Sequence, residues 1–411
     1  MRLLRRKSFI KVTGLNKMGD KILMNIRQAW LWLNNIDGIG NKKISILLGV
    51  FDSPLDIFNA KEQDLKQVMG LRLRDILEIE KSKERFDVKK FEEYLFENEI
   101  KYISIQDKDY PKALKNIYEP PHILYYKGTL PKKEDTMLGV VGSRNCSEYG
   151  KKAAYNISKS LAESNVTIVS GMAIGIDTCA HRGSLDGKGK TFAILGCGVD
   201  ICYPKSNAEL MKEIIKNGAV ISEYSPKTQP LPQMFPARNR IISGMSRGVL
   251  VVEAAEKSGS LITVDQALEQ GRDIFAIPGD ITSSLSSGTN NIIKQGAALV
   301  TSYKDILLNF GIIEIKTNPS DKAMISDSRE NIKDNIKENI KENIKENNNF
   351  DKLLDEDEKI VYSCIDLKNS HIDDIVNKSK MGISKMQHLL TMLELKGVIK
   401  QLPGKRFERL M

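Results

Sequence analysis

Seven short apolar runs separated by helical stretches constrain the fold of this chain more than any other feature of its sequence. Runs this short and this continuously apolar are typical of strands that are buried on both faces, as in parallel sheets. Stretches such as GKKAAYNISKSLAES and NAELMKEIIKNG, which lie between the runs, are typical of helices. The pattern therefore predicts βαβ units in an α/β fold with a Rossmann-like, doubly wound parallel sheet. The apolar runs are 138–142, 166–171, 191–196, 219–224, 248–254, 273–279 and 298–302.

Helical segments flank this region on both sides. Residues 24–95 predict helices interrupted by glycine, with Gly38 and Gly40 in a tight turn between two of them. The turn resembles a helix-hairpin-helix motif, whose backbone N–H groups contact DNA phosphates, and an ordinary interhelical turn explains it nearly as well. Residues 351–411 predict three helices and a β-hairpin, which is winged-helix order, but Lys385 and Glu394 on the third helix give few donors for base edges.

These segments predict four parts in the chain of 411 residues. An N-terminal helical domain of helix-hairpin-helix or SAM-like type spans 24–95, and an extended Rossmann-like domain spans 96–311. Within that domain, we expect 96–137 to be an irregular extension packed on the sheet. Residues 312–350 contain a repeat of the NIKE type, which favours a solvated low-complexity linker over a transient helix. The winged-helix domain follows at 351–411.

Composition and charge limit the function classes. The 62 Lys and Arg exceed the 53 Asp and Glu by 9, which fits a nucleic-acid partner and compositional bias about equally well. No run approaches the roughly 20 apolar residues of a membrane-spanning helix, so the sequence predicts no membrane partner. Charged residues break the N-terminal apolar positions, so we expect no signal peptide and a cytoplasmic location. The stretch that begins at Met24 is typical of a helix start, which makes Met24 an alternative initiator to Met1.

The familiar cofactor and metal motifs are incomplete. Five cysteines without a CxxC pair favour reduced thiols and disfavour a zinc site. The run SLDGKGKT nearly matches a phosphate-binding Walker A loop, but Ser184 replaces the first glycine and the run precedes a strand. The Gly196-Cys197-Gly198 run has Ile201 where a dinucleotide fingerprint needs its third glycine. We therefore expect no cofactor and no metal.

Polar and cationic residues follow the predicted strands. Because parallel strands end at one edge of the sheet, where ligands bind, we expect these residues to lie close together. These residues include groups that can bind phosphate and one aromatic ring, but no pair that could act as general acid and base. Such a set suits the binding of single-stranded nucleic acid. Taken singly, each has an ordinary explanation, such as a helix N-cap for the Ser-Gly runs at 258–260 and 286–288. The candidate DNA-binding residues are Gly142, Ser143, Arg144, Ser170, Gly171, Lys205, Phe235, Arg238, Asn239 and Arg240.

The region 100–305 resembles the DNA-processing protein DprA (Smf) family. The resemblance is carried by consecutive motifs: GVVGSRNCSEYG, VSGMAIGIDTCAH, AILGCGVDICYP, FPARNRIISGMSRGVLVVEAAEKSGSLIT, ALEQGRDIFAIPG and GTNNIIKQGA. It implies a protein without catalytic activity that binds single-stranded DNA without sequence preference and forms a homodimer. It also implies that the protein protects incoming DNA and loads the RecA recombinase during natural transformation.

The resemblance also implies roles for individual residues. Arg144, Lys205, Arg238 and Arg240 would form a basic DNA pocket, with Phe235 as a stacking residue. The long linker departs from the family pattern and leaves the orientation of the winged-helix domain open.

Two other function classes stay open at this point. One is a nucleotide-processing enzyme of the lysine-decarboxylase-like phosphoribohydrolase type, with Glu253 as the suspected catalytic residue. The run AAEKSGSLIT argues against it, because those enzymes carry a PGGxGT-type loop at that place. The other is a DNA-regulated transcription factor that uses the winged helix, and it leaves the large central domain without a ligand motif.

Overall fold

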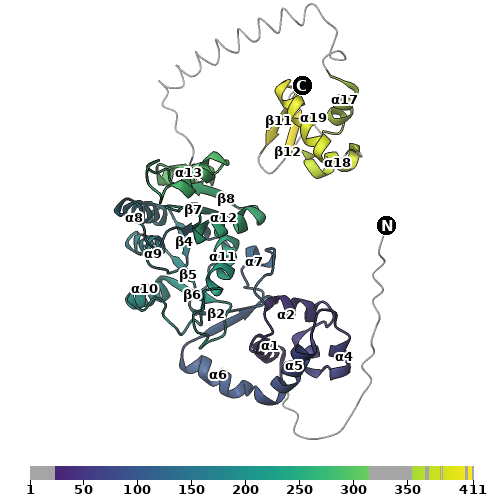
Figure 1. Cartoon of the computed structure of the whole chain (residues 1–411), viewed down its shortest axis with the longest axis vertical. Coiled ribbons are helices and arrows are strands. Elements are labelled where there is room, and N and C mark those ends of the chain that lie inside the picture. Colours follow the sequence, from purple (N-terminus) through teal and green to yellow (C-terminus); the bar gives the residue numbers. More distant parts are fainter. Residues whose placement is uncertain are drawn as a thin grey trace, which may run out of the picture. The chain divides into compact units, whose positions relative to one another are not determined.

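The computed structural model describes residues 24–313 and, further on, 354–365, 370–379, 381, 383–402 and 406–409. The chain divides into two compact units, Met1–Glu314 and Ile315–Met411 (Figure 1). The expectations for residues 1–23 and for the linker beyond 313 lie outside the described residues. Among the helices that are described, none is long and apolar enough to cross a membrane.

A nine-stranded sheet forms the centre of the first unit, in the order β1-β2-β6-β5-β4-β3-β7-β8-β9. Strands β3 to β9 run parallel, and each coincides with one of the seven predicted apolar runs. The predicted doubly wound α/β sheet is therefore confirmed. The strands are β1 (Lys101–Ser104), β2 (Ile123–Gly128), β3 (Thr136–Val141), β4 (Val166–Ser170), β5 (Thr191–Ile194), β6 (Gly218–Ser222), β7 (Gly248–Val251), β8 (Asp273–Ala276) and β9 (Ala298–Leu299).

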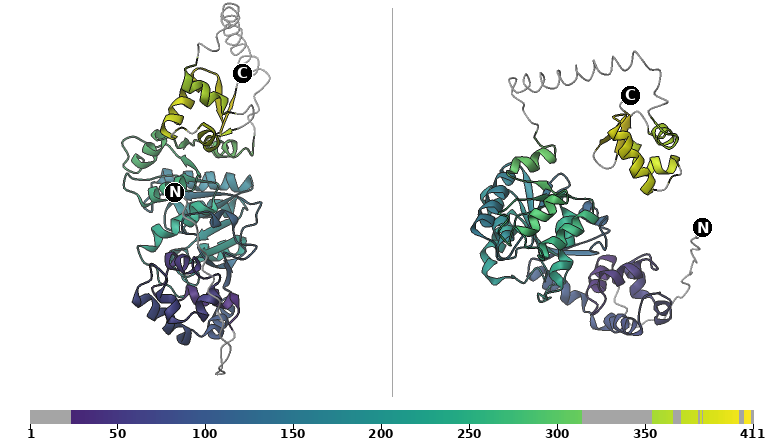
Figure 2. Two further views of the ribbon diagram at one scale, coloured as in Figure 1. Left: turned by 90° about the vertical axis from the view of Figure 1, so that its right-hand side faces the viewer. Right: turned by 45° about the horizontal axis from the view of Figure 1, so that its top comes forward.

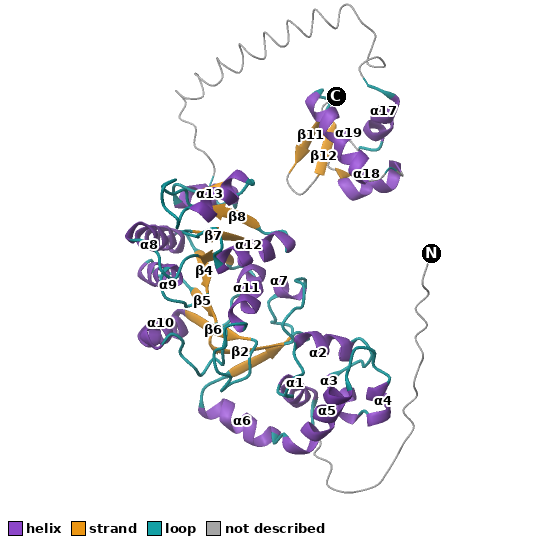
Figure 3. Cartoon of the chain, in the orientation of Figure 1, coloured by secondary structure: helices purple, strands orange, loops and turns teal. Residues whose placement is uncertain are grey.

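Helices cover both faces of this sheet (Figure 3). Apolar side chains of the α8, α9 and α14 layer meet Leu138 and Val140 on one face, while those of α11 and α12 meet Val141 and Val251 on the other. Burial on both faces explains why the strands are continuously apolar. The helices of this region are α7 (Lys112–Lys115), α8 (Glu148–Glu163), α9 (Ile176–Asp186), the 3₁₀ turn η1 (Lys205–Asn207), α10 (Ala208–Asn217), α11 (Met234–Met245), α12 (Gly259–Glu269), α13 (Ser287–Lys294) and α14 (Tyr303–Asn309).

The strand order reverses between β3 and β7, which are neighbours in the sheet. Successive parallel strands proceed from β3 toward β6 on one side and from β7 toward β9 on the other. Loops leaving β3 and β7 at their carboxyl ends therefore diverge to opposite sides. This divergence opens a crevice at the edge where such sheets bind ligands.

The expectation of an irregular extension at 96–137 is wrong in part. This stretch contains β1 and β2, which add an antiparallel edge next to β6. The β-branched and aromatic residues of KYIS and ILYYKG favour strands, but the prolines around them obscured the signal. The sheet is therefore mostly parallel.

The N-terminal helices gather at one end of the first unit, shown in purple in Figure 2. Their core is continuous with Tyr125 of β2 and Ile214 of α10, and includes the buried Trp30 and Trp32. Gly38 lies between α1 and α2 at a φ of +73°, a left-handed conformation that favours glycine, so the predicted turn is present. The helices are α1 (Ile26–Asn34), α2 (Asn41–Leu48), α3 (Pro54–Asn59), α4 (Glu62–Lys66), α5 (Leu73–Arg85) and α6 (Val88–Glu97).

The second unit has the predicted winged-helix order, with one strand more than the sequence indicated. Strand β10 pairs with β12, which also pairs with β11. Val361, Ile375 and Leu393, one from each helix, form part of a buried apolar core. The elements are α17 (Glu356–Ser363), β10 (Ser370–His371), α18 (Ile372–Ser379), α19 (Ile383–Leu395), β11 (Ile399–Leu402) and β12 (Arg406–Arg409).

We expect the first unit to lose stability in mild acid because two histidines are buried in their neutral form. Burial lowers the pKa of His122 to about 4 and that of His181 to about 3, from an ordinary value of 6.5. Unfolding exposes both rings, so the unfolded chain binds more protons and stability falls as the pH drops below 6.5. Each histidine adds a slope of about 1.4 kcal/mol per pH unit.

Urea unfolding between pH 7 and pH 5 measures this slope. His122→Gln is expected to reduce it by up to about 1.4 kcal/mol per pH unit, most of it below pH 6 where the unfolded ring is protonated, because one buried titrating group is removed. A slope that stays the same in this variant would contradict the assignment.

Candidate nucleic-acid interface

A cavity of about 510 Å³ lies at the switch point between β3 and β7. Its lining combines the loop after β3, the first half of α11 and the start of α12. It thus occupies the edge of the sheet where the sequence predicts a ligand site. Of the predicted residues, Gly142, Ser143, Arg144, Phe235, Arg238 and Asn239 line this cavity, and Gly171 lines a smaller adjoining one of about 80 Å³.

A stack of a cation and two aromatic rings forms one wall of the cavity. The Arg144 guanidinium lies 5.3 Å from the centre of the Phe235 ring, within reach of a cation–π contact. Tyr203 stacks on Phe235 with 5.5 Å between ring centres and 29° between the planes. Phe235 already has these two partners, whereas Tyr203 is 45% exposed. Tyr203 therefore presents the accessible aromatic surface of the wall.

Arg238 lies beneath the cavity and is only 4% exposed. Its Nη1 donates to two main-chain carbonyls, that of Gly171 at 2.9 Å and that of Ile194. Gly171 directly follows β4, and Ile194 is the last residue of β5. Burial lowers the pKa of Arg238, and the nearby Asp177 carboxylate opposes that effect. The guanidinium therefore ties neighbouring strand ends together while contributing positive charge to the floor of the cavity.

Two features of the sequence make room for Arg238 and offset its charge. A Cβ at Gly171 would overlap the guanidinium, so glycine here lets Arg238 keep its contacts with the strand ends. Asp177 at the start of α9 is buried, and its Oδ2 accepts from the backbone N–H groups of Gly171 at 3.2 Å and Ala173 at 3.4 Å. Burial raises the pKa of Asp177, and Arg238 opposes this shift. The loop after β4 is thus held by two buried groups of opposite charge, each of which is hydrogen-bonded to it.

Three predicted residues lie outside the lining of both cavities. Ser170 is fully buried and donates to the Val140 carbonyl at 2.6 Å, so it links two strands. Lys205 is exposed and begins η1, two residues after Tyr203. The sequence alone could not show that Ser170 is buried between strands or that Lys205 lies outside the cavity lining. The roles of both residues in DNA binding stay predictions.

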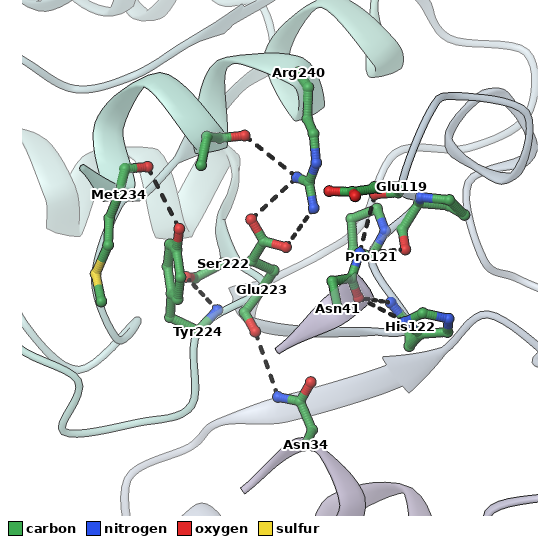
Figure 4. Close-up of polar contacts among 12 residues, drawn as sticks. Asn34, Asn41, Glu119, Pro121, His122, Ser222, Glu223, Tyr224, Met234 and Arg240 are labelled. Carbon is green, nitrogen blue, oxygen red and sulfur yellow. Dashed lines mark hydrogen bonds and ion pairs between the residues drawn. The ribbon is translucent and has the colours of Figure 1, made fainter. Parts of the chain in front are cut away.

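Arg240 is the third residue outside the lining. Its Nη1 and Nη2 donate to the two carboxylate oxygens of Glu223 at 3.0 Å and 2.5 Å, and both side chains are about 12% exposed or less (Figure 4). The main-chain carbonyl of Glu223 in turn accepts from Asn34 Nδ2 at 3.4 Å, which connects α1 to this pair. The contact is structural, and a DNA-binding role for Arg240 likewise stays a prediction.

Among the residues that line the cavity, sequence reasoning missed Tyr203 and Thr263. Tyr203 entered only as part of the motif AILGCGVDICYP, although an aromatic residue after a strand is a usable signal. Thr263 lines the cavity from the second turn of α12, and its spacing looks like that of any helix residue. Of the N-caps expected at the two Ser-Gly runs, the one at 258–260 is present, because Ser258 Oγ accepts from the Ser260 N–H. At 286–288, Ser286 occupies the N-cap position of α13 but its side chain makes no cap hydrogen bond.

Comparison with known families identifies both units. Residues 101–311 match the family described as DNA recombination-mediator protein A. Residues 351–405 match the DprA winged helix domain. The first match covers the whole sheet and the cavity described above.

Individual relatives agree with these matches. The DNA processing protein DprA of Streptococcus pneumoniae is 50% identical over 207 residues, which cover 50% of this chain and 73% of that protein. Protein Smf of Synechocystis is 32% identical over 399 residues, covering 94% of this chain and 100% of that protein. The X-ray structure of DprA from Streptococcus pneumoniae superposes with a TM-score of 0.60 at 38% identity, covering 69% of this chain and 98% of that one.

Proposed function

Because the chain belongs to the DprA (Smf) family of DNA recombination mediators, we propose that its cavity binds single-stranded DNA. The observation that carries this proposal is the wall formed by Arg144, Phe235 and Tyr203. A guanidinium pairs with a backbone phosphate, and an accessible ring stacks on an unpaired base. A base inside a duplex is already stacked on both sides, so the wall favours single strands.

The finer role is part of the same proposal. The protein protects incoming single strands and loads RecA onto them during natural transformation, and it acts as a homodimer in the cytoplasm. Support for the cytoplasm comes from the five cysteines, all of which are free thiols. The division into domains at 24–95, 96–311 and 351–411, with a linker at 312–350, also belongs to the proposal.

The rival reading as a nucleotide-processing enzyme depends on Glu253. This residue is buried, and its carboxylate accepts from the Ser147 backbone N–H at 2.8 Å and from Ser147 Oγ at 2.5 Å. Both donors belong to the N-cap of α8, so the carboxylate stabilises the start of that helix. A group with this structural task is poorly placed for acid/base chemistry, which favours binding over catalysis.

The reading as a transcription factor gains little from the winged helix. Lys385, near the start of α19, is paired with Asp357 of α17 at 2.5 Å. Because both side chains of this pair are exposed, the pair is weak, but α19 still offers few donors for base edges, with Lys385 at its start and Glu394 further on. We therefore propose that the first unit, and not the winged helix, is the main DNA-binding part.

A gel-shift comparison tests the substrate and the partner together. We expect the full chain to shift a single-stranded oligonucleotide at concentrations where the matching duplex stays free, because only unpaired bases reach Tyr203. Adding RecA should then give a slower complex that contains both proteins. Equal retention of single and double strands would contradict the proposal, whereas a missing RecA complex would remove only the loading role.

A further inference from the structure

We propose that Asp200 is a positioning residue for Tyr203, and that the N-terminal helices hold it in place through Tyr94 of α6. This inference rests on the proposed function, because Tyr203 is the ring on which a base stacks there. It gives the N-terminal helices a role in single-stranded DNA binding that needs no contact of their own with the strand.

The loop that carries Tyr203 is held at a turn. Residues 195–204, which connect β5 to η1, contain neither a helix nor a strand. Within this loop, the Ile201 N–H donates to the Gly198 carbonyl at 3.0 Å, and Asp200 lies inside the turn that this bond closes. Since Tyr203 is 45% exposed, the position of its ring depends on how firmly this backbone is held.

The Asp200 carboxylate joins the turn to two other segments of the first unit. Its Oδ2 accepts from the Tyr94 hydroxyl of α6 at 2.8 Å. Both of its oxygens accept from the backbone N–H of Lys227, in the loop after β6, at 3.0 Å. Burial and the hydrogen bond to Asp200 raise the pKa of Tyr94 to about 12, so its hydroxyl stays protonated and remains a donor at neutral pH.

Lys227 adopts a backbone conformation that the same carboxylate stabilises. Its φ of +68° lies in the left-handed region, which a lysine rarely adopts. Its N–H is fixed by Asp200, and its Nζ lies 3.7 Å from the centre of the Tyr94 ring, in a cation–π contact. A Cβ on Gly198 would lie 2.5 Å from Asp200 Oδ1 and 2.9 Å from Lys227 N, so the segments meet without spare room.

The N-terminal helices also hold both loops by other contacts. Val199 is buried in the apolar cluster that contains Trp30, and Ile201 packs against that cluster. In the loop after β6, Ser225 Oγ donates to Oδ1 of Asn35, which directly follows α1. The two loops that lead to the aromatic wall are therefore anchored on the same group of helices.

The negative charge of Asp200 makes the sign of the expected effect informative. A carboxylate near a bound strand repels its phosphates, so removing one that has no positioning role raises the affinity for DNA or leaves it unchanged. Asp200→Ala is expected to lower the affinity, because Tyr203 loses its place. Asp200→Asn keeps an oxygen that can accept from Tyr94 and from Lys227, so it should bind DNA at least as well as the unchanged protein.

Fluorescence anisotropy on the full chain tests this inference with two strands of equal length, a normal oligonucleotide and one made of abasic sites. Stacking on an aromatic side chain contributes roughly 5- to 150-fold in affinity per base. We therefore expect Asp200→Ala to weaken binding of the normal strand about tenfold and Tyr94→Phe about threefold. The abasic strand should bind to both variants as it does to the unchanged protein, because Arg144 lies on the loop after β3 and keeps its phosphate contact.

A double variant shows whether Asp200 acts through Tyr203. Tyr203→Ala removes the ring, so adding Asp200→Ala to it should change the affinity for the normal strand by less than about twofold. A further loss as large as that caused by Asp200→Ala in the unchanged protein would mean that Asp200 acts on another group, and it would overturn the inference.

Tyr155→Phe is a matched control for Tyr94→Phe. Tyr155 of α8 also donates its hydroxyl to an aspartate, Asp186 of α9 at 2.5 Å, but neither residue lines the cavities. This variant should bind the normal strand as the unchanged protein does. If thermal unfolding shows that Asp200→Ala does not fold, Tyr94→Phe carries the test, since it removes one hydroxyl and keeps the ring.

The outcomes separate this inference from the proposed function. Unchanged affinity of Tyr94→Phe and Asp200→Ala for the normal strand overturns the positioning role and leaves the proposed function standing. An equal loss of affinity for the normal and the abasic strand has the same meaning, because it shows damage that is not specific to stacking. Failure of the unchanged protein to bind single strands overturns the two together.

Discussion

Replacing Arg144 by alanine is expected to lower the affinity for single-stranded DNA by about 10- to 100-fold with little change in stability. A hydrogen bond to a charged group contributes about 1.5–3 kcal/mol, and Arg144 is the exposed cation of the cavity wall. Removing one phosphate contact should also reduce the slope of log affinity against log salt by about 0.7. Fluorescence anisotropy at several salt concentrations measures both quantities.

Two further variants make this test specific. Arg144→Lys keeps the charge but loses the planar group that lies over Phe235, so the salt slope should persist while the affinity falls by a smaller factor. Arg182→Ala removes an exposed arginine of α9 outside the cavity lining and should leave DNA binding unchanged. An Arg144→Ala protein that retains single strands as well as this control does would refute the assigned wall.

Replacing Arg238 by methionine should destabilise the first unit by about 3–5 kcal/mol, because it leaves the buried Asp177 without its opposite charge. The carbonyls of Gly171 and Ile194 would lose their donor as well. Urea unfolding followed by far-ultraviolet circular dichroism measures the effect. The exposed control Arg182→Met should stay within about 0.5 kcal/mol of the unchanged protein.

A double variant, Arg238→Met with Asp177→Asn, should recover part of the lost stability. Neutralising Asp177 removes the unpaired buried charge and keeps a side chain of similar shape. If the double variant is no more stable than Arg238→Met alone, the two charges do not offset each other. The buried position of Arg238 also means that an Arg144 and Arg238 double alanine variant would confuse lost DNA contact with unfolding.

Much of the fold was predictable from the sequence because burial on both faces leaves a direct mark on a strand. Runs such as LGVVG and TFAILG are apolar at every position except glycine or threonine, and no surface element needs that pattern. The antiparallel strands β1 and β2 lack this mark, since Tyr102 and Tyr126 are only partly buried and prolines lie between the two strands. The antiparallel end of the sheet is therefore where the prediction failed.

The location of the candidate site was predictable, but the contacts that each of its residues makes were not. The end of a parallel strand fixes where a loop begins, so Gly142, Arg144 and Phe235 could be placed together. Whether a cation faces the cavity or a buried partner depends on side chains that are distant in sequence. Glu223 pairs with Arg240, and Asp177 lies beneath the cavity with Arg238, and neither pairing leaves a pattern in the chain.

Photocrosslinking of the protein to a single-stranded oligonucleotide that contains 5-bromodeoxyuridine tests the central claim most directly. Mass spectrometry of the digested complex identifies the side chain against which a base lies. We predict crosslinks at Tyr203, with Phe235 as a secondary site, and their loss on adding an excess of unlabelled single strand. Crosslinks confined to the winged-helix unit or to the N-terminal helices, with none in 203–238, would contradict the account.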